Sequence, residues 1–261
     1  MRIFVMLLIA AATVLAQTKP IVIKAAQMFD GVSDRVVSPG LVVVLGDKIR
    51  AVGAGAEIPP GAETIDLGDA TILPGFIDAH THLTMDFDLD FSHQESVGLK
   101  KTIPEKALDS SVNARVTLMA GVTTVRDVGS SDFLDVGLRN VINSGKVPGP
   151  RMLVSVHAIG ATGGHCDNGG FRYGLFGKET GPEDGVANGP DQMRLAVRFN
   201  VKYGADIIKT CATGGVLSLT DDVDTPQLTQ EELNALVDEA HALRRKTPSW
   251  AGERLLHSWR R

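Results

Sequence analysis

The segment Asp78-Ala79-His80-Thr81-His82 holds the residues best suited to chemistry. Side chains alternate along a β-strand, so His80 and His82 point to the same side, and two imidazoles at one strand end can bind one divalent cation. Asp78 shares that side, where a carboxylate can orient a ligand histidine. The alternative is a pair of ordinary polar residues at a strand end, because a bare His-x-His motif is common.

Lys209 lies inside the apolar run 205–212. Burying a charged ammonium is costly, and desolvation lowers the pKa of a lysine until the side chain is a neutral amine able to act as a nucleophile. The alternative is a lysine at a strand end with its ammonium in water. In a barrel of parallel strands the chemistry lies at the C-terminal strand ends, and His80, His82 and Lys209 all lie toward such ends.

Strands and helices that would position these residues alternate from residue 71 onward. The expected strands are 71–82, 122–129, 151–160 and 205–212, and the expected helices are 104–120, 130–143, 191–203 and 229–243. Ser130 or Ser131 should cap the second helix, and Thr229 with Glu232 forms a capping box on the fourth. That helix should bury one face, made of Leu233, Leu236, Val237, Ala240 and Leu243. The alternation implies a parallel sheet, so the predicted fold class is α/β with about four β/α units.

Composition divides the chain into four segments. Residues 1–16 form a charged-then-apolar leader with the pattern of a signal peptide, and an uncleaved anchor is the alternative. Residues 17–70 are rich in β-prone runs and predict a small β segment, whereas residues 71–243 hold the β/α units. Residues 244–261 hold six Lys or Arg and one Glu, a net charge of +5, against −10 for the rest, because the total is −5. They form a basic tail.

A signal peptide predicts export, to the periplasm or the cell exterior, where disulfides form. Cys166 and Cys211 both follow predicted strands, so the sequence allows either a disulfide between them or two free thiols. A catalytic cysteine that works with His165 is a weaker hypothesis, because the sequence establishes no residue pair that would activate a thiolate. The net charge of −5 argues against a nucleic-acid partner, and after the leader no stretch is apolar enough to span a membrane.

Four motifs occur in a fixed order: ILPGFIDAHTHL, MAGVTTVRDVG, TGGHCD and GADIIKTCATGGV. Over about residues 20–243 the chain resembles the amidohydrolase superfamily of metal-dependent hydrolases. It looks most like the imidazolonepropionase-like branch, which includes secreted peptidases of the Xaa-Pro dipeptidase type. The resemblance implies a small β-sandwich packed against a (β/α)₈ barrel, with a centre of one or two zinc ions at the C-terminal face of the barrel.

The resemblance also implies roles for individual residues. His80 and His82 match the metal ligands of the first strand, and Lys209 matches a fourth-strand lysine that is carboxylated so that its carbamate bridges two metals. His165, in TGGHCD, matches a loop histidine near the substrate, and a solvated loop histidine is the alternative. The implied reaction is hydrolysis of an amide-type C–N bond in a small substrate, such as a dipeptide or an N-acyl amino acid, by a metal-activated hydroxide.

The remaining functional residues of that family have no match. A histidine on strand five, a histidine on strand six and an acid/base aspartate on strand eight are all missing, so no catalytic acid or base is assigned. We therefore expect a partial barrel that is truncated after the fourth unit, and our hypothesis for the cause is a frameshift near residues 244–247. Such a barrel has an unpaired edge at the fourth strand and should self-associate. An inactive fragment or a non-catalytic binding protein is the alternative function.

Overall fold

The computed structural model describes residues 19–215, 218, 220–247 and 249–250. The predicted leader, 1–16, and most of the predicted tail, 251–261, lie outside the described residues. The chain forms two compact units, Met1–Pro74 and Gly75–Arg261. Within the described part of the chain, no helix combines the length and apolar character needed to cross a membrane.

The first unit consists of two small sheets, as the β-prone runs of residues 17–70 predict. The strands are β1 (Ile21–Ala25), β2 (Gln27–Phe29), β3 (Val36–Val37), β4 (Gly40–Leu45), β5 (Lys48–Val52), β6 (Glu63–Asp66) and β7 (Thr71–Ile72). Their order is β5-β4-β1-β6 in one sheet and β3-β2-β7 in the other. Val22, Leu41 and Val43 form the core of this unit.

The strand expected over residues 71–82 is in fact two strands. Thr71 and Ile72 pair with β2 of the first unit, whereas β8 (Phe76–Thr81) belongs to the second. Pro74 lies between them, and proline has no amide N–H to donate to a sheet. The boundary between the units therefore falls after Pro74, four residues later than the composition indicates.

The second unit is built on parallel strands. β8, β9 (Val122–Asp127) and β10 (Arg151–Val154) form a parallel sheet in the order β10-β9-β8. The pairing continues beyond this sheet, because Ile159 bridges in parallel to Thr210, the first residue of β11 (Thr210–Cys211). The mixed α/β class predicted from the sequence is confirmed.

A further parallel segment follows where the basic tail was expected to begin. Lys246 bridges in parallel to Ile207, and β12 (Ser249–Trp250) pairs in parallel with β11. The change in side-chain charge at residue 244 therefore does not end the parallel pairing, because the ladder is made by backbone groups. The unpaired edge expected at the fourth strand is covered by these residues.

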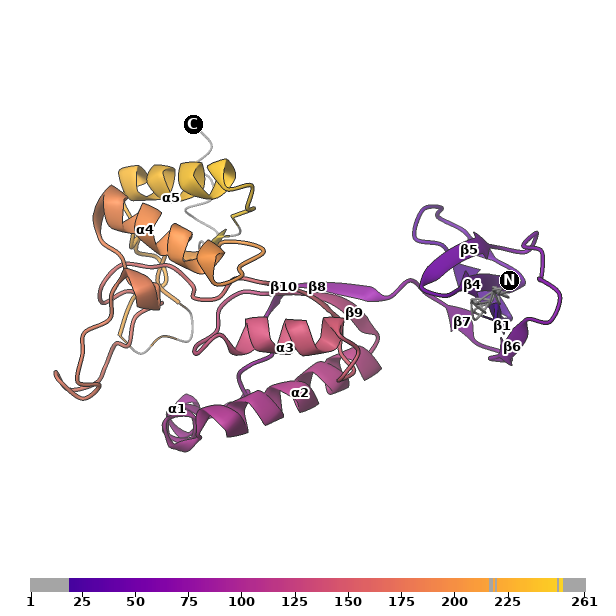
Figure 1. The fold of residues 1–261 in the computed structure, drawn as a ribbon, viewed down its shortest axis with the longest axis horizontal. Coiled ribbons are helices and arrows are strands. Elements are labelled where there is room, and N and C mark those ends of the chain that lie inside the picture. Colours follow the sequence, from indigo (N-terminus) through magenta and orange to yellow (C-terminus); the bar gives the residue numbers. More distant parts are fainter. Residues whose placement is uncertain (1–18, 216–217, 219, 248, 251–261) are drawn as a thin grey trace, which may run out of the picture. The chain divides into compact units, whose positions relative to one another are not determined.

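Five α-helices and one short 3₁₀-helix lie in the described part of the second unit (Figure 1). They are α1 (Phe91–Lys100), α2 (Ile103–Met119), α3 (Leu134–Asn143), η1 (Pro182–Asp184), α4 (Gly189–Lys202) and α5 (Gln230–Ala242). The capping box of Thr229 and Glu232 is confirmed on α5. The N-cap predicted at Ser130 or Ser131 is wrong, because α3 begins after Phe133. The Ser130 hydroxyl lies instead 2.9 Å from the Thr84 hydroxyl.

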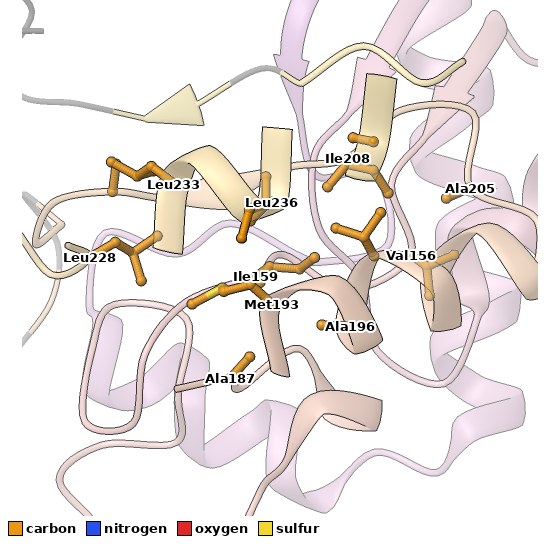
Figure 2. Close-up of a cluster of buried hydrophobic side chains, with 14 residues drawn as sticks. Val156, Ile159, Ala187, Met193, Ala196, Ala205, Ile208, Leu228, Leu233 and Leu236 are labelled. Atoms are coloured by element: carbon orange, nitrogen blue, oxygen red, sulfur yellow. The ribbon is translucent and has the colours of Figure 1, made fainter. Parts of the chain in front are cut away.

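Two apolar cores hold this unit together. In the first, Val125, Met152 and Val154 of the sheet pack against α2 and α3. In the second, α4 and α5 bury Met193 and Leu236 against the strand ends (Figure 2). The face predicted for the last helix is confirmed: Leu233, Leu236 and Ala240 are buried, and Val237 and Leu243 pack beside them.

Candidate metal centre

His80 and His82 lie together at the end of β8. Their ring centroids are 5.5 Å apart, as expected for alternate residues of one strand. The strand end is fixed from β9, where the Asp127 carboxylate Oδ2 accepts hydrogen bonds from the Leu83 N–H at 2.6 Å and the Thr81 hydroxyl at 3.3 Å. These bonds hold the residues that flank His82.

His82 has the hydrogen bond typical of a metal-binding histidine. Its Nδ1 lies 3.1 Å from the backbone carbonyl of Gly129, so a protonated Nδ1 donates to that oxygen and the Nε2 lone pair stays available. Burial lowers the pKa of His82, the Gly129 contact opposes this shift, and the positive charge of Lys209 adds to it. The arrangement favours a neutral imidazole, which is the form that binds a metal.

His80 is exposed, and its backbone is held by Asp78. Its N–H donates to Asp78 Oδ1 at 2.9 Å. The contact of Asp78 is therefore with the backbone of the histidine, where the sequence predicted a carboxylate that orients a histidine ring. Desolvation, followed by electrostatic interactions with Lys209, His82 and Arg126, lowers the pKa of His80 to about 4.

Lys209 is buried, with only 4% of its surface exposed, as the apolar run around it predicts. Its backbone carbonyl accepts a hydrogen bond from Ile159 at 2.9 Å, which fixes the strand at this point. Burial, and then the positive charge of Arg126, lower the pKa of Lys209 to about 8. The alternative of an ammonium in water is excluded.

His165 lies in the turn that follows the third strand segment. Its N–H donates to the Gln227 side-chain oxygen at 2.8 Å. Its ring lies against the backbone of Gly215, where an added Cβ would be 2.1 Å from ring atoms. Burial lowers the pKa of His165, Asp221 opposes the shift, and Lys209 adds to it. Lys209 thus acts electrostatically on His80, His82 and His165 and lowers the pKa of each.

Cys166 and Cys211 form a disulfide. The structure thereby resolves the choice between a bridge and free thiols. It also removes the cysteine nucleophile, because a bonded sulfur carries no thiolate.

The donor set at this centre is partly formed. Two imidazoles on one side of β8 fit a divalent metal, and a buried lysine whose pKa is lowered to about 8 gives up its proton more readily, as a lysine that becomes a carbamate must. In the described part of the chain no three His, Cys, Asp or Glu side chains are grouped so that they could hold a metal ion.

Arg126 and Asp127 are the residues that sequence reasoning missed. Arg126 Nε donates to the Ala79 carbonyl at 2.6 Å, and its charge acts on His80 and Lys209. Asp127 is fully buried, its Oδ1 has no hydrogen-bond partner within the described structure, and burial raises its pKa to about 7. A charged pair late in an otherwise β-prone run, VTTVRD, was the available signal.

Comparison with known proteins gives the family. Residues 71–247, more than half of the chain, match the amidohydrolase family. The chain belongs to that family. The family resemblance predicted from the motifs is confirmed.

Individual relatives agree with this assignment. The chain is 30% identical over 216 residues to an ochratoxinase of Aspergillus niger, covering 76% of this chain and 43% of the relative. A solved Xaa-Pro dipeptidase with bound methionine in its active site is 35% identical, with a TM-score of 0.78 over 89% of this chain and 57% of that one. A prolidase solved with N-methylphosphonate-L-proline is 30% identical, with a TM-score of 0.74 over 89% and 56%. The chain thus spans about half the length of these relatives.

Proposed function

We propose that the protein is a metal-dependent amidohydrolase that hydrolyses C–N bonds of small substrates such as dipeptides or N-acyl amino acids. The observation that carries the proposal is the His80–His82 pair at the end of β8 in a chain that belongs to the amidohydrolase family. The similarity to a Xaa-Pro dipeptidase and a prolidase supports the substrate class. We also propose that residues 71–243 with their continuation form part of a (β/α)₈ barrel.

His80, His82 and a carboxylated Lys209 would hold the metal, which we take to be one or two zinc ions. When bound, such a metal activates a water molecule and polarises the scissile carbonyl. The chain itself orients these ligands: the Gly129 carbonyl favours one tautomer of His82, and the Asp127 carboxylate accepts from the Leu83 N–H after it and from the Thr81 hydroxyl before it. His165 would contact the substrate. The acid/base residue that completes the reaction is not assigned to this chain.

The second candidate function is that of a non-catalytic binding protein or an inactive fragment. The observation that favours it is that the described residues supply only two preformed imidazole ligands and no group of three. General acid/base help is worth about 10²- to 10⁴-fold in rate, so a chain without that residue would turn over very slowly.

We further propose that the protein is exported to the periplasm or the cell exterior. The leader pattern of residues 1–16 supports this, and so does the Cys166–Cys211 disulfide, because such bonds persist in oxidising compartments.

Metal content and hydrolysis measured together test the function. The purified protein, His80→Ala and the control His93→Ala are assayed for bound zinc and for turnover of a dipeptide panel. His93 is a suitable control because it lies on α1 and contacts Asp88. Zinc and turnover that are lost in His80→Ala and kept in His93→Ala support the enzyme. Zinc without turnover supports the binding protein, and the absence of zinc refutes the metal centre.

A further inference from the structure

One covalent bond joins the turn that carries His165 to the strand that carries Lys209. Cys166 directly follows His165, and Cys211 lies two residues after Lys209. Their Cα atoms are 6.1 Å apart, a separation that suits a disulfide, and the two residues are 45 positions apart in the chain. The bond thus connects the neighbours of two candidate site residues that the sequence keeps far apart.

The bond rests on a tightly packed strand end. A Cβ added to Gly160 would lie 3.0 Å from the Cβ of Cys166 and 3.7 Å from the Cβ of Cys211, so both cysteines lie directly over this glycine. The Gly160 backbone is fixed by its N–H bond to Gly185 at 3.0 Å and by the bond its carbonyl accepts from Ala187 at 2.9 Å. Cys211 itself is 2% exposed. One end of the crosslink is therefore rigid.

The other end, the His165 turn, is held to the same strand mainly by weaker contacts. The His165 N–H donates to Gln227, whose own N–H donates to Ala212 at 3.0 Å, next to Cys211. A single hydrogen bond of this kind contributes about 1 kcal/mol to stability and can open transiently. A disulfide is covalent, so it keeps the turn and the strand together until it is reduced. The Cys166–Cys211 bond therefore adds a covalent constraint on the position of the turn to these non-covalent contacts.

We propose that the Cys166–Cys211 disulfide is a positioning crosslink that holds His165 beside the strand of Lys209. The proposal rests on the proposed function only in assigning His165 to the substrate. Cys166 and Cys211 act through His165 and touch neither metal nor substrate. Loss of the bond should release the His165 turn and weaken substrate binding, while the buried Lys209 and the His80–His82 pair keep their places.

The test uses the full chain with Cys166→Ala, Cys211→Ala and the double variant. Thiols are counted by titration in denaturant, and amide hydrogen exchange is followed in the peptide 161–168. We expect no free thiol in the unmodified protein. We also expect exchange at this peptide to be about tenfold faster or more in all three variants, since each removes the same bond. Reduction of the unmodified protein with a phosphine should reproduce the variants, and the same reductant should leave the double variant unchanged.

Two further readouts separate positioning from a general loss of stability. Zinc content should stay at the level of the unmodified protein, and, where hydrolysis is measurable, KM should rise more than kcat falls. The proposal is overturned if amide exchange in the variants accelerates equally in α4 and α5, or if exchange at residues 161–168 changes by less than about twofold. Two free thiols in the unmodified protein would also overturn it. Cys166→Ala keeps the test valid if Cys211→Ala fails to fold, because Cys166 is only partly buried. Thiol count and exchange need neither metal nor turnover, so the proposed function can fail while this proposal stands.

Discussion

Lys209→Met should stabilise the metal-free protein at neutral pH. Lys209 is 4% exposed, and burial with the nearby Arg126 lowers its pKa from 10.5 to about 8. Each pKa unit corresponds to about 1.4 kcal/mol, so the protonated side chain costs the folded state about 3 kcal/mol. Methionine fills a similar volume without the charge. The gain should therefore approach 3 kcal/mol at pH 7.

The sign of the pH dependence is fixed by the direction of the pKa shift. The folded protein binds the Lys209 proton less readily than the unfolded chain, so the cost is fully present below the folded pKa of about 8. It falls as the pH rises and disappears near the unfolded value of 10.5. The advantage of Lys209→Met should shrink to about 2 kcal/mol at pH 9.

Urea unfolding at pH 7 and pH 9, in chelator and carbon-dioxide-free buffer, measures both values. Lys146→Met is the matched control, because Lys146 is exposed and should change stability by less than about 0.5 kcal/mol. The same Lys209→Met variant should lose zinc, since it removes the proposed carbamate ligand. If Lys209→Met unfolds at the same or a lower urea concentration at pH 7, contacts of the ammonium outweigh its desolvation, and the reasoning is refuted.

Three further substitutions test the surroundings of the site. Gly215→Ala places a Cβ 2.1 Å from the His165 ring and should displace the ring. We expect a shifted imidazole resonance of His165 and faster amide exchange at residues 161–168. An unchanged resonance would contradict the packing of the ring against Gly215. Leu236→Ala opens a cavity between α4 and α5 and should lower the unfolding free energy by about 2 to 5 kcal/mol in urea. Thr229→Ala removes the N-cap of α5 and should cost about 1 kcal/mol, with Thr229→Ser restoring most of it. A loss below about 0.3 kcal/mol would show that the cap is replaced by water.

Sequence reasoning succeeded where the outcome depends on spacing along one element. Alternation along a strand places His80 and His82 together, and the helical repeat identifies the buried face around Leu236. The apolar run around Lys209 predicts its burial. In each case, the residues that decide the outcome are neighbours in the sequence.

Sequence reasoning failed where a residue that is distant in the sequence binds the group on which the prediction depends. Ser130 has the side chain of a good helix cap, but its hydroxyl lies against Thr84, 46 positions away. Thr71 continues the β-prone run toward His80, but it pairs with Gln27 of the first unit. Local propensity is the same for both outcomes, so only tertiary contact decides between them.

The strand β9 shows why a search of the sequence for metal-binding residues misses part of the site. Arg126 and Asp127 supply no predicted ligand, yet their side chains act on the first strand through its backbone. Asp127 holds the amide that follows His82, and Arg126 holds the carbonyl that precedes His80. The guanidinium also brings a fixed positive charge beside Lys209, which favours the neutral amine that carboxylation requires. The ligands can be predicted from one strand, whereas their positions and protonation states depend on the strand beside it.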